Sequence, residues 1–407
     1  MESVTEATVA VIAPAGDGSE GALLHADRHL PPEPTPLIGR ADLLEDACAL
    51  LQDTDVRLVT LTGAAGAGKT RLAVATAGAV APAFRDGARF VDLSSVSDPE
   101  RVAGTIATAL GVRDAGEQPL MARLQRALRD RRLLLVLDNF EQVLAAAPNV
   151  GELLAACPGV KALVTSRAAL HLRWEHELAV PPLQVPHLGS LPALAELAGV
   201  PAVALFLHRA RAVRHDFVLD EAGARAVAEV CVRLDGLPLA IELAASRTRV
   251  LPPAALLSRL ERRLQLLVGG APDRPTRHQT LRAALDWSHE LLEAPERALL
   301  RRLAVFAGGF TLEGAAAVAG DVGPRDVLDA LETLVDNSLV RPAPVLRGEA
   351  RYSLLETVRE YAAERLAASG NGPAVRRRHA AHYLTLAETA AGALRGATQT
   401  VWLARLE

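Results

Sequence analysis

Lysine is almost missing from this 407-residue chain, which carries only Lys69 and Lys161. Every other fixed cation is an arginine, so a lysine at position 69 indicates a site that needs a compact ammonium group. The three cysteines, Cys48, Cys157 and Cys231, are far apart and odd in number. Their spacing argues against a disulfide framework or a zinc site, and we expect small buried residues instead.

Aromatic residues are also scarce, at 3% of the chain, although half of all residues are hydrophobic. This balance favours packed helices over β-sandwiches. No apolar run reaches the roughly 18 residues that span a bilayer, and Glu2 and Glu6 stand where a signal peptide would be basic. We therefore expect a cytoplasmic protein that makes no use of a membrane. The net charge of −4 gives no general reason to expect an anionic partner.

The order of apolar and glycine-rich stretches predicts several domains. Residues 1–36 are rich in Ala, Gly and Pro and are expected to form a disordered leader. In residues 37–185, short apolar strands alternate with helices, which predicts a parallel sheet covered on both faces. The expected strands are 57–62, 88–93, 133–137 and 160–165, and the expected helices are 42–51, 70–80, 99–110 and 118–129. Ligands of such sheets bind at the carboxyl ends of the strands.

Helical patterns dominate the rest of the chain. A helical domain is expected over residues 186–270, with helices at 200–213, 221–234, 237–250 and 253–266 and a linker at 269–272. Residues 271–355 show short helices at 280–292, 295–305, 312–319 and 327–337, and then candidate strands at 339–341 and 351–354. That order is the outline of a winged helix. Residues 356–407 are again amphipathic helix, at 356–368 and 375–390, so the fold class is α/β plus α.

One glycine-rich loop has the pattern of a phosphate-binding site. The pattern G-x-x-x-x-G-K-[ST] is matched at every position by Gly63, Ala64, Ala65, Gly66, Ala67, Gly68, Lys69 and Thr70. Such a loop wraps its backbone N–H groups around a phosphate chain at the start of a helix. We expect Lys69 to reach the β- and γ-phosphates and the Thr70 hydroxyl to bind Mg²⁺. Arg71, the next helical residue, is counted among the nucleotide-binding residues.

A second element of the site is expected at the end of the strand over residues 133–137. Asp138 follows this strand and is predicted to hold Mg²⁺ through water. Asn139 stands where many ATPases place a second acid that activates water, and an amide cannot accept the proton. We therefore predict slow or partner-dependent hydrolysis. Glu141 could act as the base instead, or it could be a first-turn helix acid that the helix dipole favours.

An arginine follows the next strand. Arg167, within Thr165-Ser166-Arg167, is expected near the γ-phosphate, where it would sense or neutralise charge; a surface ion pair is the alternative. Neither lysine lies in the Asn-Lys-x-Asp pattern of guanine-specific proteins. The predicted ligands are therefore ATP or ADP with Mg²⁺, and the predicted catalytic group is Asp138, Asn139 and Arg167.

Five motifs in order resemble the NB-ARC-like signal-transducing ATPases with numerous domains (STAND). They are Leu37-Ile38-Gly39-Arg40, the phosphate loop, Leu135-Val136-Leu137-Asp138-Asn139, Thr165-Ser166-Arg167 and Gly236-Leu237-Pro238-Leu239-Ala240. The chain is most similar to bacterial regulators of the LuxR/AfsR type, which join such an ATPase to tetratricopeptide repeats. The end of the chain, residues 376–407, resembles the lead-in to those repeats.

This resemblance implies roles for further residues. Ile38 and Arg40 would flank the adenine, and Pro238 would pack on it. Many relatives carry a Met-His-Asp motif whose His contacts the ADP β-phosphate, but Leu355 stands at that position here. Such proteins are implied to rest with ADP and to open on ATP exchange plus an inducer. An inducer or protein partner acting through the repeats, and nucleotide-dependent self-association, are the implied partners.

Two other functions stay open. A DNA-binding regulator would use the winged helix, near which arginines gather at positions 259, 262, 263, 274, 277, 282 and 376–378. Because acids alternate with these arginines, we interpret them as solvated helix faces and expect DNA contact only through a domain outside this chain. A metabolic phosphotransferase would need its own acid or base near the γ-phosphate, and none follows Arg167. The pairs His25 and His29, and His379 and His382, lack a third metal ligand.

Overall fold

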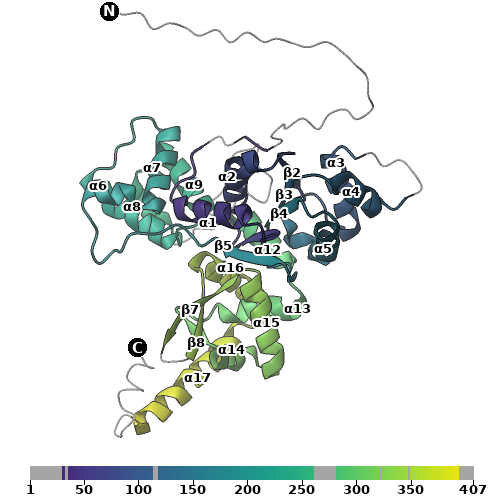
Figure 1. The fold of residues 1–407 in the computed structure, drawn as a ribbon. Coiled ribbons are helices and arrows are strands. Elements are labelled where there is room, and N and C mark those ends of the chain that lie inside the picture. Colours follow the sequence, from purple (N-terminus) through teal and green to yellow (C-terminus); the bar gives the residue numbers. More distant parts are fainter. Residues whose placement is uncertain are drawn as a thin grey trace, which may run out of the picture.

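The first part of the molecule is a parallel β-sheet. The structure is a computed structural model that describes residues 30–32, 35–112, 118–260, 281–320, 323–346 and 349–393. Its larger sheet has five strands in the order β2-β3-β4-β1-β5, and all of its pairings are parallel (Figure 1). The strands are β1 (Leu58–Thr62), β2 (Ala88–Asp92), β3 (Leu133–Asp138), β4 (Val160–Thr165) and β5 (Glu175–Ala179).

Helices cover both faces of this sheet, as the continuously apolar strands predict. In β3, Leu133, Leu135 and Leu137 belong to one apolar cluster, whereas Leu134 and Val136 belong to another. This alternation follows from the two-residue period of a strand. One face packs on α1 (Ala41–Gln52) and α2 (Lys69–Val80), and the other on α3 (Val102–Ala109), α4 (Leu120–Leu128) and α5 (Ala147–Ala156). Short 3₁₀ turns follow α2 and precede α3 and α5.

A helical part follows the sheet. Its helices are α6 (Leu194–Gly199), α7 (Pro201–Val213), α8 (Glu221–Arg233), α9 (Pro238–Ser246) and α10 (Pro253–Arg259). Asp220 caps α8, because its carboxylate accepts a hydrogen bond of 2.7 Å from the backbone N–H of Gly223. The chain enters this part through Pro181 and Pro182. Before them the Val180 N–H donates to the Thr62 carbonyl (2.7 Å), and after them the Leu183 N–H donates to the Gly236 carbonyl (2.9 Å).

The last part has the arrangement of a winged helix. A three-stranded antiparallel sheet, in the order β6-β8-β7, packs with helices below the larger sheet in Figure 1. Its strands are β6 (Phe310–Thr311), β7 (Val340–Leu346) and β8 (Glu349–Leu354). Its helices are α12 (Leu281–Glu290), α13 (Ala294–Leu303), α14 (Leu312–Ala319), α15 (Pro324–Asp336), α16 (Glu356–Ala368) and α17 (Gly372–Ala393). The predicted fold class, α/β followed by helical and winged-helix parts, is confirmed.

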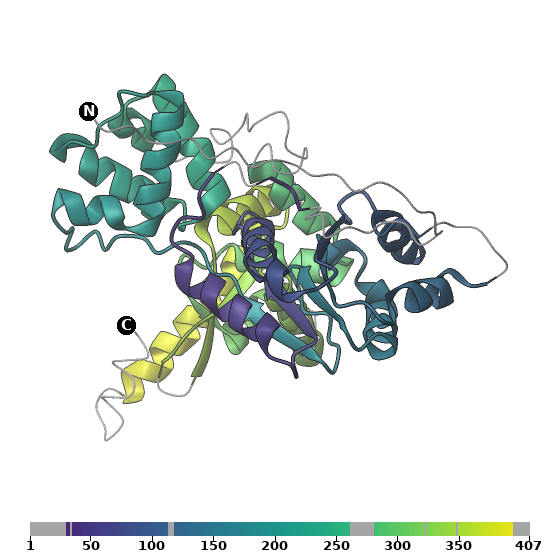
Figure 2. The same cartoon turned by 45° about the horizontal axis from the view of Figure 1, so that its top comes forward.

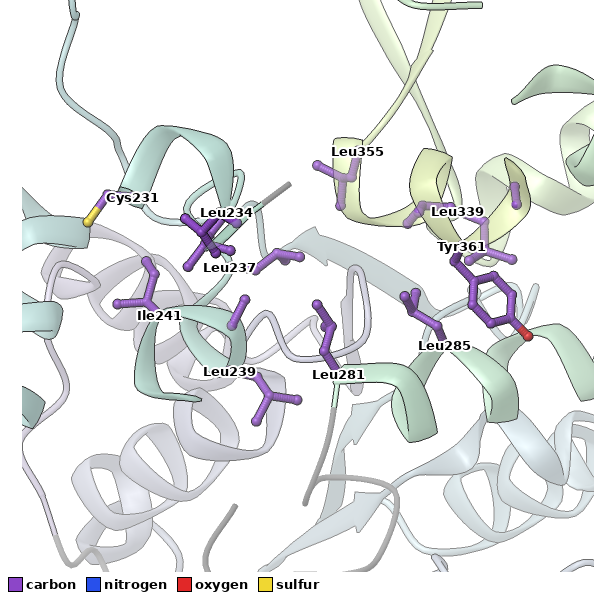
Figure 3. Packing of buried hydrophobic residues seen from close by; sticks show 14 of the residues in the cluster. Cys231, Leu234, Leu237, Leu239, Ile241, Leu281, Leu285, Leu339, Leu355 and Tyr361 are labelled. Carbon is purple, nitrogen blue, oxygen red and sulfur yellow. The ribbon is translucent and has the colours of Figure 1, made fainter. Parts of the chain in front are cut away.

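The helical and winged-helix parts share one hydrophobic core. A single cluster of buried residues runs from Leu183 through α7 to α9 and on into α12 to α16. Figure 3 shows side chains of both parts side by side in this cluster, among them Leu234, Leu237, Leu281 and Leu355. A backbone hydrogen bond of 3.2 Å from the Thr357 N–H to the Asp235 carboxylate crosses the same contact. These two parts are therefore packed as one body. In Figure 2 the helices of the helical part, in teal, form the group at the upper left.

Several elements differ from the sequence-based expectation. Strand β5 was not expected; it is an edge strand whose residues are all at least partly exposed, so its sequence lacks an apolar run. Helix α5 was missed because Pro148 and Gly151 interrupt its pattern, although proline fits the first helical turn. Helix α6 and strand β6 are short and were also missed. The helix expected over residues 237–250 ends at Ser246 and continues as a 3₁₀ turn.

Several of the expected element ends and domain boundaries fall at residues that the structure does not describe. Most of the predicted leader, the linker at 269–272 and the end of the helix expected at 253–266 lie outside the described residues. The predicted domain boundaries stay predictions. Within the part of the chain that the structure describes, no helix is long and apolar enough to cross a membrane.

Candidate nucleotide-binding site

The glycine-rich loop joins β1 to α2 at the carboxyl end of the sheet. Gly63 and Gly66 have φ angles of 145° and 79°, in the region that favours glycine. A Cβ on Gly63 would lie 2.5 Å from the Val180 carbonyl oxygen, and one on Gly66 would lie 2.8 Å from Leu239 Cβ. The loop thus needs glycine at these two positions, and its backbone can form the kind of cradle that surrounds a phosphate chain.

Lys69 lies buried inside this cradle. Its Nζ donates to the carbonyl oxygens of Gly63 (2.6 Å) and Ala64 (3.2 Å). Burial lowers the pKa of Lys69 to about 8, since desolvation disfavours the ammonium; the nearby Glu141 carboxylate acts in the opposite direction. A phosphate ligand would supply the opposite charge that this ammonium needs. The fit of the loop to a phosphate chain thus rests on both shape and charge.

Asp138 ends β3 and is surrounded by hydrogen-bond donors. Its Oδ1 accepts from the hydroxyl groups of Thr70 (2.7 Å) and Thr165, and its Oδ2 accepts from Asn139 Nδ2 (2.6 Å). Burial raises the pKa of Asp138 to about 6, against the effect of the two hydroxyl groups. A divalent cation would favour the ionised carboxylate, and the Thr70 hydroxyl and Asp138 are the oxygen ligands that Mg²⁺ prefers. These residues therefore fit a Mg²⁺ ion that accompanies the phosphates.

The side chain of Asn139 contacts Asp138, whereas a water-activating residue would have to contact the attacking water. Its side chain points to Asp138, and its backbone N–H donates to Thr165 Oγ1 (3.0 Å). The residue has a positive φ of 62°, a conformation that asparagine adopts more readily than most residues. Its amide therefore orients the carboxylate of Asp138. Thr165 was quoted in the sequence motif but was not assigned this contact.

Arg167 is buried just after β4 and joins the sheet domain to the winged-helix part. Its Nε lies 3.2 Å from Glu141 Oε1, and both side chains are 4% exposed. Its guanidinium carbon lies 4.6 Å from the centre of the Trp287 ring on α12. Its backbone carbonyl accepts a hydrogen bond of 3.2 Å from Ser338 Oγ. The ion pair with Glu141 is therefore a buried one, and the contact with Trp287 was not predicted from the sequence.

These residues line one cavity of about 380 Å³, within the range typical of small-molecule sites. The phosphate loop, Asp138 and Arg167 form one end. Further residues of the wall are Pro31, Pro32, Thr35, Leu37, Val74, Phe90, Asp92, Arg209, Pro238, Leu239, Glu242 and Trp287. The sheet domain, the helical part and the winged-helix part all contribute to this wall. Pro238 is one of these residues, and a Cβ on Gly68 would lie 4.0 Å from its Cγ; its contact with an adenine stays a prediction.

Two residues implied to flank an adenine do not line the cavity. Arg40 is buried, and its guanidinium donates to the carbonyl oxygens of Ala67 (3.2 Å) and Pro181, so it braces the loop from behind. Ile38 packs against the core of the helical part. Their contact with a nucleotide stays a prediction. Leu37, one position earlier, does line the cavity.

The end of the predicted leader differs from the expectation of disorder. Arg71 donates to both the carbonyl and the hydroxyl oxygen of Thr35, each at 2.7 Å, and to the Pro36 carbonyl at 2.9 Å. Arg71 also lies 3.5 Å from Glu242, which accepts a hydrogen bond of 2.8 Å from Arg209. This network fixes residues 35–36 across the open side of the cavity. The proline-rich composition of this stretch does not by itself predict these hydrogen bonds.

Leu355 lies in the shared core of the helical and winged-helix parts and does not line the cavity (Figure 3). It is 4% exposed. The position at which the resemblance implies a phosphate-binding histidine is thus occupied by a packing residue, and Trp287 of α12 lines the cavity instead. From the sequence, a tryptophan on an amphipathic helix is interpreted as a core residue. The sequence pattern therefore gave no reason to predict Trp287 as a site residue.

Two family models match the chain. The model described as "AAA domain" matches residues 52–177, and the one described as "Winged helix-turn-helix domain" matches residues 292–367. Uncharacterized protein Rv0894 of Mycobacterium tuberculosis is 42% identical over 359 residues, which are 87% of this chain and 86% of that protein. The chain belongs to the same family as this protein. The resemblance to P-loop ATPases joined to a winged helix is thereby confirmed.

Other relatives are longer regulators. A Mycobacterium tuberculosis protein provisionally named HTH-type transcriptional regulator Rv0890c is 45% identical over 334 residues, which are 81% of this chain and 36% of that protein. Regulatory protein AfsR of Streptomyces coelicolor is 33% identical over 333 residues, covering 78% of this chain and 30% of AfsR. The chain thus spans about a third of the length of these regulators.

Among solved structures, the chain is similar to a STAND protein with a tetratricopeptide repeat sensor from Pyrococcus horikoshii. The identity is 17%, the TM-score is 0.34, and the match covers 88% of this chain and 47% of that protein.

The described residues contain no group of three or more His, Cys, Asp and Glu side chains that could hold a metal ion. His25 and His29 lie outside the described residues, while His379 packs on Phe306 and Tyr383.

Proposed function

We propose that this chain is an adenine-nucleotide switch in which Mg²⁺ and the phosphates bind at Lys69, Thr70 and Asp138. The observation that supports this most directly is the shared cavity: the phosphate loop, the helical part and the winged-helix part all line it. A nucleotide in that space would contact all three at once. A ligand shifts a conformational equilibrium only through contacts that differ between the two states, and these parts supply such contacts.

Hydrolysis is proposed to be slow. Asn139 is engaged with Asp138, and Glu141 forms a buried ion pair with Arg167. Neither side chain is placed as a free proton acceptor for an attacking water. Loss of a general base typically removes roughly 10²- to 10⁴-fold in rate. A slow turnover suits a switch, because the bound state must last long enough to be sensed.

Calorimetry on purified protein tests this proposal. We expect ADP and ATP to bind with Mg²⁺ and GTP to bind more weakly. Lys69→Ala should weaken both adenine nucleotides by roughly 100-fold, because a buried charge-assisted contact to phosphate is lost. The matched control is Lys161→Ala, whose ammonium contacts the carbonyl oxygens of Leu51 and Asp53 away from the cavity. Folded protein that gives no heat with either nucleotide would refute the proposal.

A transcriptional role is proposed from the relatives. Regulators such as AfsR share this stretch but extend far beyond it, so the output, an inducer acting through helical repeats, and self-association belong to the longer protein and remain proposals. The match to a winged helix-turn-helix favours a second candidate function, direct DNA binding by residues 292–367.

The charge of α15 argues against that second function. In a helix-turn-helix the second helix enters the major groove, and here that helix carries exposed Asp326, Asp329, Glu332 and Asp336. Asp336 also lies 3.7 Å from His171 Nε2 of the sheet domain. Acidic side chains repel the DNA phosphates. Titration of a labelled DNA duplex at increasing salt separates the two candidates: steeply salt-dependent binding would favour DNA recognition by this chain.

A further inference from the structure

Trp287 is a winged-helix residue that reaches the phosphate end of the cavity. Its ring lies 4.6 Å from the Arg167 guanidinium, and both residues line the cavity together with Lys69 and Asp138. A guanidinium over a tryptophan face is attracted by the ring, and the attraction is stronger where water is excluded. Arg167 is 3% exposed, so this contact is made in a buried setting.

Arg167 has a second partner in Glu141, 3.2 Å away. The other carboxylate oxygen of Glu141, Oε2, is buried without a hydrogen-bond partner among the described residues. The charge of this acid is therefore compensated by Arg167, in direct contact, and by the nearby Lys69 ammonium. A bound γ-phosphate would present a third group that attracts the same guanidinium, and a bound diphosphate would not.

The side of α12 next to Trp287 is tied into the winged-helix part. Asp286 accepts a hydrogen bond of 2.8 Å from the Tyr361 hydroxyl on α16 and pairs with Arg365 of the same helix. The His289 ring makes an edge contact with Tyr361. A displacement of Trp287 would therefore be carried into α16 as well as α12.

We propose that the winged-helix part and the terminal phosphate of the nucleotide compete for the Arg167 guanidinium. In the arrangement seen here Trp287 and Glu141 hold the guanidinium. A γ-phosphate draws it away, which loosens the contact of α12 with the sheet domain. Trp287 is thus a positioning residue that sets the preference between ADP and ATP. This inference rests on the proposed nucleotide switch.

The ratio of ATP to ADP affinity tests it. Trp287→Ala frees Arg167 for the phosphate, so we expect ATP to bind roughly tenfold more tightly relative to ADP, a change of about 1.4 kcal/mol. Trp287→Phe keeps an aromatic ring that attracts the guanidinium more weakly, so it should give an intermediate ratio of ATP to ADP affinity. The matched control is Trp174→Ala, because its ring also lies 4.6 Å from an arginine, Arg173, but lines no part of the cavity. Thermal unfolding with ADP present checks that each variant is folded.

Fluorescence gives an independent measurement. In the Trp174→Phe/Trp402→Phe double variant, Trp287 is the sole tryptophan of the chain. A non-hydrolysable ATP analogue should change its emission, whereas ADP should leave it near that of the free protein. If the wild type binds both nucleotides but Trp287→Ala leaves their ratio unchanged, the inference is wrong and the switch proposal stands. If the wild type binds neither nucleotide, both are wrong.

Discussion

The phosphate end of the cavity and the contact between the helical and winged-helix parts are built in opposite ways. At the phosphate end, a loop supplies backbone groups, and a few buried charged side chains are held by hydrogen bonds or an ion pair. At the other contact, leucines from distant stretches, among them Leu237 and Leu355, supply most of the packing (Figure 3). The first arrangement is suited to bind an ion and to respond to pH and ligand; the second holds two parts in a fixed relation. A switch needs both.

The largest expected effect comes from breaking the apolar contact alone. Leu355→Ala removes buried methyl groups and leaves a cavity, so the free energy of unfolding should fall by about 2–3 kcal/mol. Affinity for ADP should stay within about threefold of the wild type, because Leu355 does not line the cavity. Urea unfolding and calorimetry give the two quantities.

Leu384→Ala is the control for that experiment, since Leu384 on α17 is 60% exposed. It should change the free energy of unfolding by no more than about 0.5 kcal/mol. A comparable loss in both variants would mean that the contact at Leu355 is not the stabilising one. Loss of ADP binding in Leu355→Ala would instead link that position to the nucleotide.

A change of pH should act on the phosphate end alone. The pKa of Lys69 in the free protein is about 8, so the ammonium is already present below that pH and affinity for ADP should be constant there. Above pH 8 binding must take up a proton, because the bound phosphates favour the charged lysine. Affinity at pH 9 should therefore be about tenfold weaker than at pH 7.5.

The Lys69→Arg variant provides the comparison, because arginine remains charged throughout this range. Its ADP affinity, although weaker overall, should not change between pH 7.5 and 9. Calorimetry in buffers of different ionisation enthalpy should detect proton uptake by the wild type above pH 8 and none by the variant. An equal decline in the two proteins would assign the titration to another group.

The smallest effect is expected at Asn139. Asn139→Asp restores the second acid that many ATPases carry, yet the side chain points to Asp138 Oδ2 at 2.6 Å. Two carboxylates at that distance oppose each other's ionisation, so the new acid should be protonated or should weaken Mg²⁺ binding. We expect ATP turnover to change by less than about threefold, measured by phosphate release. A rise of 100-fold would show that residue 139 can reach the attacking water.

The phosphate end could be predicted from sequence because its chemistry requires fixed residue types at fixed spacing along a strand, a loop and a helix. Lys69 and Thr70 are placed by the local geometry of the loop, and Asp138 meets Thr70 because parallel strands end at the same edge of the sheet. Trp287 could not be predicted, because its neighbour Arg167 is 120 residues away and only the tertiary fold brings them together. Strand β5 was not predicted for a related reason: an edge strand needs no apolar run once the neighbouring strand supplies the hydrogen bonds.

The passage from the sheet into the helical part sets how these parts can move. Pro181 and Pro182 are the two residues between the last backbone–backbone hydrogen bond to the sheet and the first to the helical part, and Arg40 also holds the Pro181 carbonyl. Their rings fix φ, which leaves only ψ free at each residue. A rotation of the helical and winged-helix body about these two residues would therefore be restricted to a narrow range of directions.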